Sequence, residues 1–70
     1  MKTRIKLDTY LGEGKFHDRL AILYELDART YCVDIYNNDE VIKTVSYDKK
    51  SLAYHESVAE NFVMGIKNYD

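Results

Sequence analysis

The sequence of residues 20–47 is LAILYELDARTYCVDIYNNDEVIKTVSY, and it decides the fold. Three runs in it, residues 20–26, 31–36 and 41–47, are rich in β-branched and aromatic residues, which favour strands. The runs are separated by residues 27–30 (DART) and 37–40 (NNDE), whose Asp and Asn residues are typical of tight turns. Successive runs joined by such short turns predict three antiparallel strands connected as a meander.

A fourth strand is expected ahead of this stretch. Apolar or β-branched residues alternate with charged ones through residues 4–9, RIKLDT, which is the period of a strand with two different faces. The segment Gly12-Glu13-Gly14-Lys15 then predicts a turn that leads into the run beginning near residue 19. The chain is therefore expected to form a four-stranded antiparallel sheet.

The register of the sheet follows if every turn closes a four-residue loop. Leu11 then faces Phe16, Tyr36 faces Val41, and the expected core face carries the pairs Ile5–Ile22, Leu7–Leu20, Tyr24–Val33, Leu26–Tyr31, Ile22–Ile35 and Ile35–Ile42. The opposite face carries the pairs Asp34–Lys43 and Cys32–Val45. A slip of one residue in any hairpin would turn a whole strand over, so the agreement between hairpins supports this register.

A change of period after Asp48 predicts a helix over residues 50–67. Its apolar stripe consists of Leu52, His55, Val58, Ala59, Phe62 and Ile66, spaced as one face of a helix requires. Asp48 or Ser51 is expected to cap its start, and Gly65 to end it or to be tolerated inside it. The predicted fold is α+β, a four-stranded antiparallel β-meander packed on one face by a single C-terminal α-helix, with residues 1–70 as one domain.

Composition and charge exclude several classes of protein. The fractions of apolar (46%) and charged (31%) residues are those of a folded chain. Cys32 is the only cysteine, so no internal disulfide forms, and together with His17 and His55 it does not supply a zinc site. Without a secretion signal at the N-terminus, a cytoplasmic location is expected. The net charge is −2, and neither the basic N-terminal part nor the acidic middle of the chain is strong enough to indicate nucleic-acid binding or DNA mimicry.

No catalytic or cofactor signature is present. A Cys–His nucleophile needs the two side chains within hydrogen-bond reach, and the expected register puts Cys32 and His55 on opposite sides of the sheet. The carboxylates are scattered over turns and strand edges, and the Gly-Glu-Gly segment precedes a strand rather than a helix, unlike a phosphate-binding loop. We therefore expect no enzyme activity and no cofactor.

The outer face of the expected sheet is more apolar than a face left in water. Its members most suited to a contact are Leu23, Tyr36, Val41, Val45 and Tyr47. A contiguous patch of this kind indicates a protein partner or a second copy of the chain, and tyrosine is enriched at such interfaces. The sequence thus predicts a partner-binding surface on these five residues and a homodimer.

The alternative function is nucleic-acid binding by the basic first strand. Lys2, Arg4 and Lys6 lie on one side of that strand, and Arg19 follows at the start of the next one. Basic side chains with nearby tyrosines can hold a nucleic-acid strand, although Glu25 and Asp34 are expected on the same face. Lysines on an edge strand also guard against edge-to-edge pairing.

Residues 31–66, YCVDIYNNDEVIKTVSYDKKSLAYHESVAENFVMGI, resemble small uncharacterised proteins of tailed bacteriophages, especially phages of marine cyanobacteria. The likeness lies in a strand-turn-strand that leads into a helix ending in Ala59, Glu60, Asn61, Phe62, Gly65 and Ile66. The resemblance implies a phage accessory protein acting in the cytoplasm of an infected bacterium, where such proteins bind a host protein or self-associate. It carries no catalytic residues to this chain.

Overall fold

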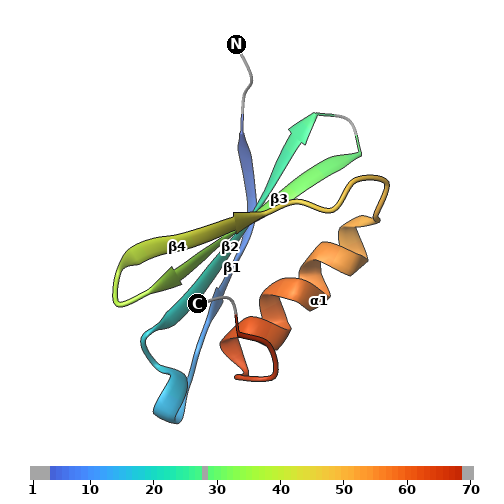
Figure 1. Cartoon of the computed structure of the whole chain (residues 1–70). Helices are drawn as coiled ribbons and strands as arrows, with labels where there is room; N and C mark the ends of the chain where they lie inside the picture. The colour runs from blue at the N-terminus through green and yellow to red at the C-terminus, as the bar shows by residue number, and fades with distance from the viewer. Residues whose placement is uncertain (1–3, 28, 69–70) are drawn as a thin grey trace.

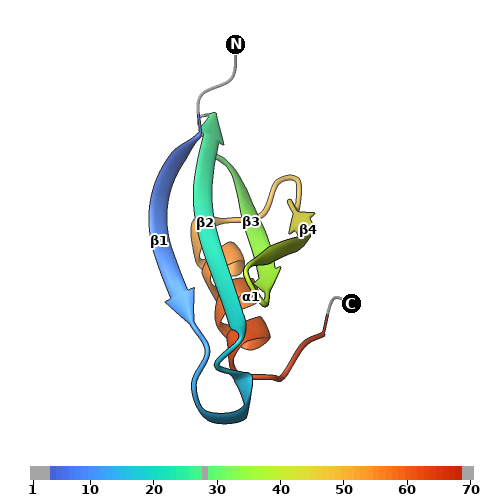
Figure 2. The same ribbon diagram turned by 90° about the vertical axis from the view of Figure 1, so that its left-hand side faces the viewer.

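The computed structural model describes residues 4–27 and 29–68, and it confirms the predicted fold class. The chain runs through β1 (Ile5–Leu11), the short 3₁₀ helix η1 (Gly14–Phe16), β2 (Arg19–Asp27), β3 (Thr30–Asn37), β4 (Glu40–Val45) and α1 (Leu52–Val63). The strands form one antiparallel sheet in the order β1-β2-β3-β4. Helix α1 covers one face of it (Figures 1 and 2), so that the view in Figure 2 looks onto the uncovered face. We call this uncovered side the outer face.

The register differs from the predicted one because each hairpin contains an irregularity. The pairing shifts between Lys6 and Asp8 in β1, between Glu25 and Asp27 in β2, and between Ile35 and Tyr36 opposite β4. These shifts leave Leu7, Leu26 and Ile42 without a direct cross-strand partner, as the extra residue of a β-bulge does. Each bulge offsets the ladder by one residue.

The bulge at Leu26 turns β2 over relative to the expectation. The strands pair as far as Asp27 and Thr30, inside the predicted four-residue loop, and Tyr31 pairs with Glu25 rather than Leu26. Beyond the bulge Tyr24 pairs with Cys32 instead of Val33. Ala21 and Leu23 therefore face the helix, and the side chains expected there point to the outer face; these are Leu20, Ile22 and Tyr24. The predicted pairings of β2 with β3 are wrong for this reason.

The other two hairpins depart from the expected register in related ways. The loop after β1 is longer than predicted, because it contains η1, and Leu11 pairs with Leu20 rather than Phe16. The last hairpin turns within the predicted segment 37–40, but its loop has two residues, Asn38 and Asp39, with φ values of 54° and 66°. Tyr36 pairs with Val41 as expected. Beyond its bulge, Val45 lies opposite Val33 and Asp34 opposite Thr44, not opposite Cys32 and Lys43 respectively.

The core lies between β2, β3, the end of β4 and helix α1. Its fully or nearly buried side chains are Ala21, Leu23, Val33, Ile35, Val45, Ala59, Phe62 and Val63. The predicted helix stripe is right at His55, Ala59 and Phe62, which are all buried. Within the described residues, no helix is long and apolar enough to cross a membrane.

The ends of α1 are fixed by local hydrogen bonds. The Ser51 side chain accepts a hydrogen bond from the backbone N–H of Tyr54, so Ser51 is the N-cap. The helix ends earlier than predicted, at Val63. The N–H groups of Gly65 and Ile66 donate to the carbonyls of Phe62 and Asn61, which is the Schellman arrangement. Gly65 has φ +83°, and a Cβ there would overlap the Phe16 ring.

Candidate interaction site

The structure divides the five residues of the predicted partner surface between the two sides of the sheet. Leu23 and Val45 are only 1% and 6% exposed, because the bulges turn them toward α1. Tyr47 packs against the core on the same side. Tyr36 and Val41 remain on the outer face, opposite each other. The prediction that all five share an exposed face is therefore wrong.

A row of apolar side chains nevertheless crosses the outer face from edge to edge. Leu11 pairs with Leu20, Leu20 with Tyr36, and Tyr36 with Val41. Leu11 and Val41 at the two edges are 71% and 51% exposed, and Leu20 and Tyr36 between them are half-buried. We call these four residues the apolar row.

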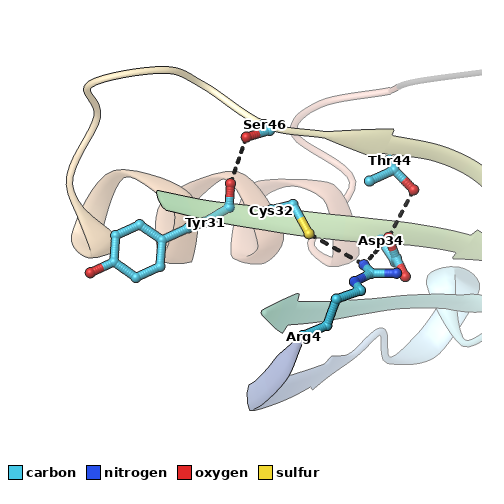
Figure 3. Close-up of polar contacts among 6 residues, drawn as sticks. All are labelled: Arg4, Tyr31, Cys32, Asp34, Thr44 and Ser46. Atoms are coloured by element: carbon cyan, nitrogen blue, oxygen red, sulfur yellow. Dashed lines mark hydrogen bonds and ion pairs between the residues drawn. The ribbon is translucent and has the colours of Figure 1, made fainter. Parts of the chain in front are cut away.

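A polar cluster occupies the other half of the outer face (Figure 3). Arg4, just ahead of β1, reaches across the sheet, and its Nη2 donates to Oδ1 of Asp34 at 2.9 Å and to Sγ of Cys32 at 3.2 Å. The Thr44 hydroxyl donates to the same oxygen of Asp34 at 2.8 Å. The guanidinium carbon of Arg4 also lies 4.0 Å from the centre of the Tyr24 ring. Arg4 and Tyr24 thus cover Cys32 and Asp34, which would otherwise face solvent.

The charges in this cluster balance within the face. The hydrogen bond to Asp34 raises the pKa of Arg4, and burial raises the pKa of the Tyr24 phenol. Asp34 is 5% exposed, and a carboxylate in such a site needs a cation and hydrogen bonds. The ion pair therefore holds Arg4 in place and neutralises the buried carboxylate of Asp34.

The four basic residues of the nucleic-acid alternative do not form one patch. Arg4 is engaged with Asp34, and Lys2 lies outside the described residues. Arg19 packs between the rings of Phe16 and Phe62, at 4.7 and 4.8 Å from their centres. It donates to the carbonyls of Phe62 and Lys67 and to the Asn68 side chain.

Arg19 therefore closes the C-terminal end of α1, where cations are favourable. It also lies at the opposite end of the β1–β2 hairpin from Arg4. Of the four residues, only Lys6 is an exposed cation of the outer face that forms no side-chain hydrogen bond or ion pair within the part of the chain that the structure describes.

The residues considered for catalysis also lie apart. Cys32 is buried on the outer face, under Arg4, while His55 is buried on the helix side of the sheet, as expected. His17 is exposed and contacts Asp18 at 3.0 Å. Among the described residues, no group of three or more His, Cys, Asp or Glu side chains could hold a metal ion.

Two cavities lined by described residues lie beside the sheet, and sequence reasoning pointed to neither. One, of about 310 Å³, is lined by Leu11, Glu13, Phe16, Val63 and Met64, next to one end of the apolar row. The other, of about 380 Å³, is lined by Arg29, Tyr31, Lys49, Lys50, Ser51 and Leu52. The second cavity takes three basic residues, Arg29, Lys49 and Lys50, from two separate turns. No sequence motif connects these turns, so the sequence alone does not predict the cavity.

Comparison of the chain with models of protein families, with curated proteins and with solved structures finds no match.

Proposed function

We propose that this protein is a non-enzymatic interaction module that forms a homodimer through the outer face of its sheet. The observation that carries the proposal is the apolar row, which runs across every strand of the sheet and is exposed at both edges. Apolar residues contiguous across a solvent-facing sheet favour burial against another protein surface. Tyr36 gives the row an aromatic residue at its centre, of the type enriched in interfaces.

A second copy suits this face because of its charge. The carboxylate of Asp34 is neutralised by Arg4 within the same face, so the Asp34 carboxylates of two copies would not repel each other. In a symmetric dimer each row would lie against the other, as self-complementary interfaces require.

The size of the face sets the expected strength of the dimer. Four strands about 4.8 Å apart and about seven residues long give a flat area of roughly 450 Å². A standard stable interface buries about 800 Å² per partner. The dimer is therefore weak and concentration-dependent.

Analytical ultracentrifugation over a range of concentrations tests the proposal. The wild-type protein is expected to shift from monomer to dimer with increasing concentration, and Val41→Lys to remain monomeric at every concentration. Ile5→Lys is the matched control, because Ile5 is equally exposed, at 54%, but does not belong to the apolar row. A wild-type monomer at high micromolar concentration, or a Val41→Lys dimer of unchanged strength, would overturn the proposal.

The resemblance of residues 31–66 to phage proteins supports a setting for this activity. We propose that the protein acts in the cytoplasm of an infected bacterium. If a bacterial protein binds the same face in place of the second copy, the chain stays monomeric in the ultracentrifuge, and a pull-down from bacterial lysate captures that protein with the wild type but not with Val41→Lys.

A further inference from the structure

The larger cavity gathers an excess of positive charge. Three of its six lining residues are basic, Arg29, Lys49 and Lys50, and none is acidic. This contrasts with a chain whose net charge is −2. Within residues 4–27 and 29–68, no carboxylate forms an ion pair with any of the three. A concave site lined by charges of one sign concentrates ions of the opposite sign.

Hydrogen bonds hold together the two turns that supply these cations. The Ser46 hydroxyl donates to the Tyr31 carbonyl at 2.6 Å, which joins the end of β4 to the start of β3 (Figure 3). The backbone N–H of Tyr47 donates to Nε2 of His55 at 3.1 Å, which joins the same segment to α1. The backbone positions that carry Arg29 and Lys49 are thereby brought to the lining of one cavity.

Tyr31 gives the cavity an aromatic wall. Its ring packs against the buried His55 ring, with the centres 5.5 Å apart, and its half-buried side chain also lines the cavity. Leu52 adds an apolar side chain to the lining. Flat aromatic walls bind the rings of nucleobases, whatever their sequence.

We infer that this cavity binds a nucleoside phosphate, with the base against Tyr31 and the phosphate between Arg29 and Lys49. Arginine and lysine are the residues that commonly bind phosphate, and about 380 Å³ is within the range of small-ligand sites. The start of α1 contributes little, because the N–H groups of Tyr54 and His55 already bond to Ser51. The cavity contains no residue of the apolar row, so nucleotide binding can be tested independently of the homodimer.

The test is an NMR titration of the full chain with adenosine monophosphate, adenosine and inorganic phosphate. Adenosine monophosphate is expected to produce saturable shifts centred on the amides of Tyr31, Ser51 and Leu52. Adenosine and inorganic phosphate, which each carry one half of the ligand, are expected to bind more weakly. If either binds as tightly as adenosine monophosphate, or if millimolar nucleotide gives no saturable shifts at these amides, the inference is overturned.

Charge-removing variants locate the phosphate. The double substitution Arg29→Gln/Lys49→Gln is expected to weaken nucleotide binding about tenfold, as for the loss of charged hydrogen bonds. Both positions have a φ near +64°, and Gln meets the same backbone demand as the residue it replaces. The control Lys15→Gln/Lys43→Gln removes the same charge from two exposed sites outside the cavity. Equal affinities in the two double variants would overturn the inference.

A further arm identifies the source of the ligand. A short single-stranded oligonucleotide with a 5′-phosphate presents the same chemistry as the free nucleotide. Tighter binding of the oligonucleotide at the same amides would assign the site to the end of a nucleic-acid strand. Tighter binding of adenosine monophosphate would assign it to a free nucleotide.

Discussion

The backbone N–H of Tyr47 donates a hydrogen bond to Nε2 of His55 at 3.1 Å. Because that nitrogen accepts, the proton of the neutral ring is on Nδ1, which lies 2.9 Å from the Ser51 carbonyl. His55 is fully buried and packs against the rings of Tyr31, Tyr47 and Tyr54. One side chain therefore links the end of the sheet to the first turn of α1.

The first prediction concerns the ring protons of His55. Nitrogen NMR near neutral pH is expected to show the tautomer with its proton on Nδ1. The substitution His55→Phe leaves the Tyr47 N–H without its acceptor, and an unsatisfied buried donor costs about 1–3 kcal/mol. Urea unfolding measures that loss, with the exposed His17→Phe as the control. A proton on Nε2, or equal stabilities of the two variants, would contradict this assignment.

The second prediction tests the register of β2. Leu23→Ala removes a side chain that is 1% exposed, and the loss of such a leucine costs about 2–5 kcal/mol. Ile22→Ala removes a half-buried side chain of the outer face and is expected to cost at least about 1 kcal/mol less. Urea unfolding at low protein concentration compares the two. A larger loss of stability for Ile22→Ala would show that β2 has the register predicted from the sequence, without a bulge at Leu26.

The bulges are the part of the fold that sequence reasoning missed. The turn at Asn38 and Asp39 and the cap at Ser51 were predictable, because each depends on local chemistry of a few residues. The side of β2 that packs against the helix was not predictable. Both alternating sets of its residues are largely apolar, so the hydrophobic period alone does not choose between them. Ala21 and Leu23 face the helix only because Leu26 is bulged.

The candidate sites were only partly predictable for a related reason. Tyr36 and Val41 were placed on the outer face because their pairing depends on the short turn between them. Leu20 is expected on the core face because the bulge at Leu26 has no sequence signal, and Leu11 is expected opposite Phe16 because no turn motif encodes the length of the loop containing η1. The basic cavity depends on Arg29 and Lys49, which are distant in sequence and meet only after the sheet and helix have packed.

The third prediction concerns Arg19. Arg19→Met keeps the packing between Phe16 and Phe62 but removes the hydrogen bonds to the Phe62 and Lys67 carbonyls. The expected loss of stability is about 1–3 kcal/mol. Amide hydrogen exchange is expected to speed up most at residues 64–67, which follow the helix. Lys6→Met, at an exposed cation of β1, is the control. Exchange unchanged at 64–67 would show that Arg19 does not hold the helix end.

The last prediction is a loss of stability in alkaline solution that depends on Tyr10. Burial raises the pKa of Tyr10 to about 12, and the carboxylates of Asp8, Glu56 and Glu60 add to the shift. The phenol ionises near 10 in the unfolded chain. Below pH 10 both states hold the proton and the stabilising contribution is complete. Between pH 10 and 12 the unfolded state releases the proton first, so stability falls with rising pH.

Tyr10→Phe removes this contribution, and its stability is expected to fall less steeply than that of the wild type between pH 10 and 12. Urea unfolding at a series of pH values measures the difference. Contributions of the other groups are common to both proteins and cancel in the comparison. Tyr54→Phe, at an exposed tyrosine of α1, is expected to follow the wild type. If Tyr10→Phe follows it as well, the Tyr10 phenol is not held in its protonated form by the fold.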